Sequence, residues 1–239
     1  MDLSNRLLEI TKFVPLNSIV ADIGTDHGYI PTYLIINNIS KKVIASDLSP
    51  GSLQKTIEYV NKFNLNDRIS PRLGDGLDII KPYEVDTVII AGMGGLLISE
   101  ILEKNKDITN TITKFILQPM VASKELRSYL LANGYMIEEE SLAKEGKRFY
   151  EIIVARKGES DNQKDIYYEI GYKLIEKKHP LLEEFIEHKK KAVRDVMVKL
   201  TSEKNPNIDK RYSELSKILK AYEEVESLIE GKEYYREDE

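Results

Sequence analysis

The sequence predicts an α/β fold, in which a mainly parallel sheet ends in an antiparallel hairpin and is followed by a C-terminal domain of helices. Two observations support this prediction. Between residues 19 and 155, short apolar segments alternate with amphipathic ones, as strands and crossover helices do around a parallel sheet. Beyond Arg156 no β-like segment follows, and apolar residues recur at helical spacing.

Short segments rich in apolar and β-branched residues predict the strands of this sheet. We expect them at residues 19–23, 42–46, 69–73, 87–91, 114–117, 135–141 and 150–156. The last two are separated by the short segment AKEGKRF, in which Gly146 suits a turn. They should therefore pair as an antiparallel hairpin.

Amphipathic segments between the strands predict the crossover helices. We expect these helices at residues 28–37, 50–63, 96–105 and 123–133. Ser123 is an expected N-cap, and Asn133-Gly134 is an expected helix stop.

A change of composition near residue 160 predicts two domains, residues 1–160 and 161–239. KGESDNQKD marks the change, and from residue 165 to about 231 the spacing predicts two or three helices. Their apolar stripe suits a helical core or a coiled-coil seam. These helices would either contact a partner molecule, with Lys189, Lys190, Lys191 and Arg194 near phosphates, or form a weak homodimer.

Composition narrows the classes of function. The 239 residues include no cysteine and three scattered histidines, so we expect no disulfide, no thiolate nucleophile and no metal site. No segment has the length of a membrane span or the order of a signal peptide, which predicts a cytoplasmic protein without a membrane partner. The net charge of −5 requires any RNA-binding surface to be a local patch.

Acidic residues accompany glycines at the carboxyl ends of the first three predicted strands. The first loop reads DIGTDHG from Asp22, the second begins at Asp47, and the third reads GDGL with Asp75 at its second position. The carboxyl ends of parallel strands meet at one edge of a sheet, where an acid after the second strand can accept both ribose hydroxyls of a nucleoside. An acid in the third loop can accept from an adenine amino group. The three loops together predict a nucleoside site.

The charge of the first loop indicates which nucleoside ligand fits. A pyrophosphate would be repelled by the carboxylates of Asp22 and Asp26, whereas a sulfonium and an ammonium group would be attracted. We therefore expect S-adenosylmethionine rather than a dinucleotide.

The fourth predicted strand ends in AGMGG, and residues 92–95 would leave room for a flat base beside the transferable methyl group. A tight turn into the next helix is the alternative explanation of these glycines. Gln118, after the fifth predicted strand, could hydrogen-bond a base edge, although Pro119 alone would also explain the local geometry.

These motifs resemble those of bacterial tRNA (adenine-N1)-methyltransferases of the TrmK type. The resemblance rests on ADIGTDHGYIP, ASDLSPGSL, GDGL, AGMGG, LQP and RFYEIIVARKG, and it extends into the C-terminal helices. It implies a Rossmann-like class I methyltransferase sheet with a C-terminal coiled-coil domain. It also implies that S-adenosylmethionine is used to methylate N1 of the adenine at tRNA position 22.

The resemblance also implies roles for individual residues. Those at the target base would be Asp26, His27, Met93 and Gly94. Those around the cofactor would be Asp22, Gly24, Tyr29, Asp47, Leu48, Gly74, Asp75, Gly76 and Gly92. Asp26 would orient the base or take a proton, and the alternative is that it merely holds its loop. Tyr29, Tyr33, Phe149 and Tyr150 are candidates for stacking the flipped base.

Two other functions fit the residues less well. One is a methyltransferase that acts on a small molecule or a protein. The other is a catalytically silent module that binds RNA.

Overall fold

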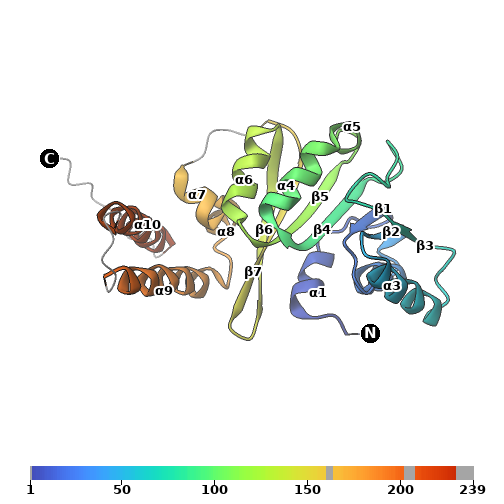
Figure 1. Cartoon of the computed structure of the whole chain (residues 1–239), viewed down its shortest axis with the longest axis horizontal. Helices are drawn as coiled ribbons and strands as arrows, with labels where there is room; N and C mark the ends of the chain where they lie inside the picture. The colour runs from blue at the N-terminus through green and yellow to red at the C-terminus, as the bar shows by residue number, and fades with distance from the viewer. Residues whose placement is uncertain (1, 160–163, 202–207, 230–239) are drawn as a thin grey trace. The chain divides into compact units, whose positions relative to one another are not determined.

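The computed structural model describes residues 2–159, 164–201 and 208–229, and Figure 1 shows its helices and strands. The chain divides into two compact units, Met1–Asn162 and Gln163–Glu239, which are described separately below.

The first unit is built on one seven-stranded sheet in the order β3-β2-β1-β4-β5-β7-β6. Its strands are β1 (Ser18–Ile23), β2 (Ser40–Asp47), β3 (Ile69–Leu73), β4 (Thr87–Gly94), β5 (Lys114–Val121), β6 (Tyr135–Glu145) and β7 (Arg148–Lys157). The first five run parallel, and β7 pairs antiparallel with both β5 and β6. The predicted parallel sheet with a terminal hairpin is confirmed.

Helices cover both faces of this sheet. They are α1 (Asn5–Thr11), α2 (Tyr29–Ile36), α3 (Pro50–Lys62), α4 (Gly95–Lys104), α5 (Lys106–Thr109) and α6 (Ser123–Ala132). Helices α4 and α6 lie side by side on one face in Figure 1, and their apolar residues belong to one core cluster. Apolar residues of α1, α2 and α3 belong to the cluster on the other face. The sequence interpretation did not include α1 or α5.

One predicted helix signal is wrong and another is confirmed. Ser123 is the first residue of α6 rather than its N-cap; the cap is Ala122, which adopts a φ of 60° and makes no side-chain capping bond. At the other end, Asn133 is the C-cap and Gly134 has a φ of 71°, which suits glycine.

The strand order changes direction between β1 and β4. From β1 the chain proceeds to β2 and β3 on one side, and it returns through β4 and β5 on the other. In open α/β sheets, ligands bind outside the carboxyl ends of the strands at this switch point. The loops after β1, β2, β3 and β4 all lie at this edge.

A buried ion-pair network joins the terminal hairpin to α6. The guanidinium of Arg127 donates to Glu140 of β6 and to Glu151 of β7, with both donor–acceptor distances 2.7 Å. Arg127 is 1% exposed, and the two carboxylates are also buried. Because its charges are compensated, the network can lie in the interior, where it fixes the hairpin against the helix.

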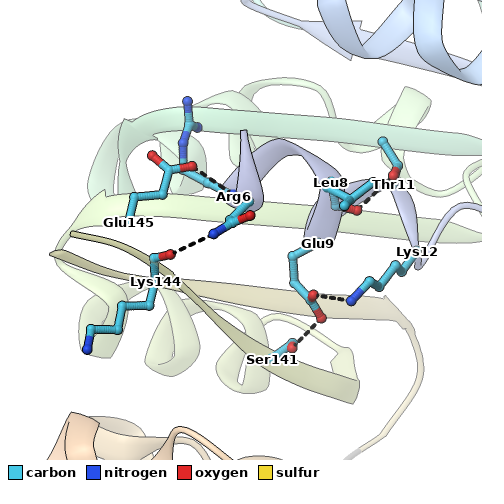
Figure 2. Close-up of polar contacts among 9 residues, drawn as sticks. Arg6, Leu8, Glu9, Thr11, Lys12, Ser141, Lys144 and Glu145 are labelled. Atoms are coloured by element: carbon cyan, nitrogen blue, oxygen red, sulfur yellow. Dashed lines mark hydrogen bonds and ion pairs between the residues drawn. The ribbon is translucent and has the colours of Figure 1, made fainter. Parts of the chain in front are cut away.

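The N-terminal helix α1 lies against the same hairpin, as Figure 2 shows. The backbone N–H of Arg6 donates to Oε1 of Glu145 at 2.8 Å, and the side chain of Asn5 donates to the carbonyl of Lys144 at 3.3 Å. One turn further along, Ser141 Oγ donates to Oε1 of Glu9 at 2.7 Å. The hairpin thus fixes α1 beside the switch point.

The second unit is helical. Its elements are α7 (Asp165–Ile170), α8 (Tyr172–Glu176), α9 (Leu182–Thr201) and α10 (Ile208–Ile229). The described part contains four helices rather than two or three, because Gly171 interrupts the first with a φ of 91°. The predicted end near residue 231 lies outside the described residues.

Helices α9 and α10 pack through part of the predicted apolar stripe. In the described part of the unit, the buried apolar residues are Ile170, Leu174, Leu182, Phe185, Ile186, Leu215, Tyr222 and Val225. Lys190, expected near phosphates, is instead buried, and its Nζ lies 2.6 Å from Oε2 of Glu226. Among the helices that the structure describes, none combines the length and apolar character that a membrane span requires.

Candidate functional site

A cavity of about 770 Å³ lies at the carboxyl ends of the parallel strands. This size is within the usual range for small-molecule sites. It is lined by Ser4, Arg6, Leu7, Asp22, Ile23, Gly24, Thr25, Asp26, His27, Tyr29, Ile30, Asp47, Leu48, Gly74, Asp75, Gly76, Ala91, Gly92, Met93, Leu97, Ile101 and Met120. Of the residues to which the resemblance assigns a role at the target base or around the cofactor, all except Gly94 line this cavity.

The loop after β1 is held by backbone hydrogen bonds. The N–H groups of Gly24 and Thr25 both donate to the carbonyl of Ser46, at 2.8 and 2.9 Å. Gly24 has a φ of 75°, and a side chain there would overlap the methyl end of Met93. The positive φ favours glycine at this position, whereas the end of the flexible Met93 side chain could move to make room for a Cβ.

Asp47 connects the first two loops. Its carboxylate accepts from the backbone N–H of Ser49 at 2.8 Å and from that of Asp26 at 3.2 Å. These bonds orient the carboxylate at the end of β2, and its remaining acceptor positions can receive two hydroxyl donors from a ribose.

Asp22 is a buried carboxyl group at the end of β1. Asp22 is only 4% exposed. This burial raises the pKa of its carboxyl group to about 6, and the negative charge of Asp47 raises it further. A carboxylate in this position is costly unless a positive charge approaches it. The site is thus complementary to a cation.

We expect Asp22→Asn to stabilise the ligand-free protein by about 1–3 kcal/mol at neutral pH, because the substitution removes a buried negative charge. The unfolded state binds its proton less tightly than the folded state, so ionised Asp22 opposes folding above the folded-state pKa. The gain should shrink as the pH falls from about 6 toward the unfolded pKa of 3.8, and it should vanish below that value, where the carboxyl group is protonated in both states.

Urea unfolding of wild type and variant across this pH range measures the effect. The exposed Asp67 provides the matched control, since Asp67→Asn should change the free energy of unfolding by less than about 0.5 kcal/mol. An Asp22 variant that is less stable than wild type at neutral pH would contradict the assigned cost.

The loop after β3 contributes the third acid. Gly74 donates its N–H to the carbonyl of Asp47 at 3.1 Å, so the second and third loops are also connected. The carboxylate of Asp75 is 61% exposed and lies 3.4 Å from Nζ of Lys104. A ligand amino group at this end of the cavity would share that carboxylate with the lysine.

Asp26 lines the cavity with a largely exposed side chain. The side chain is 61% exposed, and its Oδ2 lies 3.3 Å from Nε2 of His27. The ring of His27 in turn lies 5.2 Å from that of Tyr29, which is half-exposed. Asp26 holds its loop through its backbone N–H, so the carboxylate is not required for that purpose.

The glycines after β4 serve different purposes. Gly92 has a φ of 81° and lines the cavity with Met93, whereas Gly94 caps α4 outside it with an ordinary φ of −70°. A Cβ at Gly95 would overlap the carbonyl oxygen of Ala122. Gly95 therefore permits α4 to pack closely against the end of β5. This close packing, rather than space for a base, explains why a glycine is needed at position 95.

Arg6 is a site residue that the sequence interpretation missed. Its Nη1 donates to Oε1 of Gln118 at 2.7 Å, and Nε2 of Gln118 donates to the carbonyl of Pro119 at 2.8 Å. Gln118 is fully buried, and both the oxygen and the nitrogen of its side-chain amide have protein partners. Gln118 does not line the cavity, and in this structure its amide contacts Arg6 and Pro119.

Of the four aromatic residues expected to stack a base, Tyr29 lines the cavity and Tyr33, Phe149 and Tyr150 do not. The half-exposed apolar side chains of Leu97 and Met120, and the more exposed Leu48, also line it. Flat apolar ligands would find contact area on these side chains.

Comparisons with known proteins bear on this site. A family model described as tRNA (adenine(22)-N(1))-methyltransferase matches residues 20–224. A Bacillus subtilis (strain 168) protein of that name is 38% identical over 161 residues, which are 67% of this chain and 68% of the relative.

Solved structures agree over nearly the whole chain. The Streptococcus pneumoniae protein Sp1610 in complex with S-adenosyl-L-methionine has a TM-score of 0.85 and 28% identity, and the match covers 94% of this chain and 99% of that one. M. capricolum TrmK, in complex with S-adenosyl-homocysteine, has a TM-score of 0.81 and 28% identity over 95% and 99% of the two chains.

Proposed function

The chain belongs to the tRNA (adenine(22)-N(1))-methyltransferase family, and we propose that the cavity at the switch point is where its methyl donor and its target adenine meet. The enzyme uses S-adenosylmethionine to methylate N1 of adenine 22 in tRNA. The observation that carries the proposal is the ring of four carboxylates, Asp22, Asp26, Asp47 and Asp75, around one cavity of suitable size.

The residues present fit S-adenosylmethionine. Asp47 would accept from the ribose hydroxyls, with Leu48 beside it. Asp75, between Gly74 and Gly76, would accept from the adenine amino group. Asp22 would balance the positive charge of the sulfonium and the ammonium, which is the compensation that its burial requires.

The remaining positions complete the cofactor end. Gly24 and Gly92 would allow close approach of the backbone, and Tyr29 would cover the ligand with its ring.

The reaction needs positioning more than proton transfer. When bound, S-adenosylmethionine supplies an activated methyl group, which adenine N1 accepts with its own in-plane lone pair. The residues of the chain must therefore align the base and exclude competing water. Met93 and the mouth residues Leu97 and Met120 would provide apolar surface for the adenine ring, and Gly94 would act only through the shape of this loop.

Asp26 would act on the charge that develops at the base. Methylation at N1 makes the adenine ring cationic and its N6 amino group more acidic. A carboxylate beside N6 accepts a hydrogen bond that strengthens as this charge forms, which lowers the barrier. His27 would orient that carboxylate through the contact between its Nε2 and Asp26 Oδ2.

The tRNA substrate would place the enzyme in the cytoplasm. The second unit would bind this tRNA away from the target base. Lys191 is exposed on α9, Lys189 is half-buried with its Nζ over the ring of Phe185, and Lys190 is buried against Glu226. We expect Lys189→Gln/Lys191→Gln to raise the KM for tRNA several-fold at moderate salt without changing cofactor affinity, since phosphate contacts dominate such binding. An unchanged KM would instead favour a role in homodimer formation, measurable by sedimentation.

A crystal structure of the chain with S-adenosylmethionine tests the proposed site. We expect the ribose hydroxyls on Asp47 and the sulfonium on the side of Asp22. A cofactor bound elsewhere, or a ribose that does not contact Asp47, would refute the assignment.

A further inference from the structure

The hairpin of β6 and β7 continues past the rest of the sheet as a two-stranded arm, which Figure 1 shows. Toward its tip, β7 pairs with β5 no further than Ile153, whereas its pairing with β6 continues to Glu145 and Arg148. A two-stranded ribbon is marginally stable by itself, so this arm needs support. Helix α1 provides it, because Asn5 and Arg6 both donate hydrogen bonds to the end of β6.

The tip of the arm is adjacent to the cavity. It is bonded to the first turn of α1, and Ser4, Arg6 and Leu7 of that segment line the cavity. Gly146, with a φ of 60°, and Lys147 form the turn that closes the hairpin. The tip therefore belongs to the surface that surrounds the cavity.

Two exposed cations, Lys147 and Arg148, lie at this tip. Within the part of the chain that the structure describes, neither has a carboxylate at ion-pair distance. The neighbouring carboxylate of Glu145 accepts from the backbone N–H of Arg6, and Figure 2 shows its side chain on the side of α1. The charges of the two cations are thus available to a partner.

The third cation of the arm has internal contacts instead. Nζ of Lys144 lies 5.5 Å from the centre of the Phe149 ring on the facing strand. The carbonyl of Lys144 accepts from the side chain of Asn5. This difference singles out Lys147 and Arg148 from the basic residues of the hairpin end.

The charge of the cavity makes cations beside it necessary for an RNA substrate. Four aspartates line the cavity, and charges repel phosphates over a distance of about 8 Å at physiological salt. Lys104, next to the third loop, cannot offset this repulsion freely, because its Nζ lies 3.4 Å from Asp75 and 2.6 Å from Asp78. The tip of the arm supplies two cations that are not used in this way.

We propose that Lys147 and Arg148 bind the backbone phosphates next to the target adenosine of the tRNA. This inference rests on the proposed function. N1 lies on the Watson–Crick edge, so the adenine has to leave its pair to enter the cavity, while its phosphates stay outside. Ammonium and guanidinium groups are common phosphate partners, and such contacts position a nucleic acid without reading its sequence. The arm would thus hold the strand at the cavity against the repulsion of the acids.

Kinetics of the double variant Lys147→Gln/Arg148→Gln with unmodified tRNA test the proposal. We expect the KM for tRNA to rise by about 3- to 30-fold at low salt, from the loss of two exposed ion pairs. The slope of log KM against log salt concentration should fall by about 1–2. The kcat and the cofactor affinity should stay within about twofold of wild type, because neither residue lines the cavity.

The matched control is Lys41→Gln/Lys42→Gln, which removes two exposed lysines near the start of β2, at the opposite edge of the sheet. It should change the KM for tRNA by less than about twofold. Equal melting temperatures of wild type and both variants would show that the fold is intact. A double variant of the arm with the wild-type KM and salt slope would overturn the proposal, and so would a loss confined to kcat.

A tRNA with one neutral methylphosphonate locates the contact. Neutralising a phosphate adjacent to nucleotide 22 should raise the KM of wild type and have little further effect on the arm variant. A methylphosphonate in the anticodon stem should affect both proteins equally. Additive losses at every phosphate adjacent to nucleotide 22 would contradict the assigned contact. A wild type that methylated none of these tRNAs would refute the proposed function itself.

Discussion

Asp26→Asn should reduce the rate of methyl transfer by about 100-fold or more while leaving the affinity for S-adenosylmethionine within a few-fold of wild type. The loop should survive this substitution. Asp26 has a φ of 53°, a conformation that asparagine tolerates, and its N–H can still donate to Asp47. What is lost is the negative charge beside the base.

Single-turnover rates with saturating tRNA and cofactor measure this effect, and calorimetry measures the affinity. Asp67→Asn, an exposed acid outside the cavity, should react at the wild-type rate. If Asp26→Asn reacted as fast as wild type, its carboxylate would have no part in catalysis. Asp26→Ala adds backbone strain at positive φ, so a loss confined to that variant would indicate a loop effect.

Arg127→Met should lower the free energy of unfolding by about 3–5 kcal/mol, because the substitution leaves the carboxylates of Glu140 and Glu151 buried without their cation. For a chain of this size the melting temperature should fall by about 6–20 °C. Glu140 and Glu151 lie on the strands of the hairpin that anchors α1. The same variant should therefore also loosen Arg6 at the cavity.

Thermal and urea unfolding measure the loss. The control is Arg156→Met, which removes an exposed arginine paired with Glu138 on the same hairpin and should cost less than about 1 kcal/mol. Replacing all three members of the buried network by apolar residues of similar volume should recover most of the stability. A single Arg127 variant as stable as wild type would show that the buried charges are compensated in another way.

The sheet and most of the cavity could be predicted because their signals are local. Each strand is a short apolar segment, and the acids Asp22, Asp47 and Asp75 lie at or just after the carboxyl ends of three of these strands. Parallel strands then bring those loops to one edge without any further information. The assigned roles of the residues remain predictions that the binding and rate measurements above address.

What could not be predicted depends on contacts between distant parts of the chain. Arg6 hydrogen-bonds to Gln118, which lies 112 positions further along the chain, and no local sequence pattern predicts this contact. A capping serine at position 4 before an apolar segment could have indicated α1, since Ser4 accepts a hydrogen bond from the N–H of Leu7. The close approach of Gly95 to Ala122 likewise exists only after β5 and α4 have packed.

Local sequence rules also gave wrong predictions for one helix cap, one helix boundary and one surface lysine. Ser123 was expected to cap α6, yet Ala122 occupies that position with a φ of 60°. In the second unit, Gly171 divides a helix that apolar spacing alone presents as continuous. Lys190 reads as a member of a basic surface, but packing of α9 against α10 turns it toward Glu226.

The most direct test of the whole account is the position of the methyl group on the product. Unmodified tRNA would be incubated with the enzyme and labelled S-adenosylmethionine, digested to nucleosides and mapped, beside a tRNA in which guanosine replaces the adenosine at position 22. The account predicts 1-methyladenosine at that position and no label in the substituted tRNA. Label at another position, on N6 of adenine, or in both tRNAs equally would contradict it.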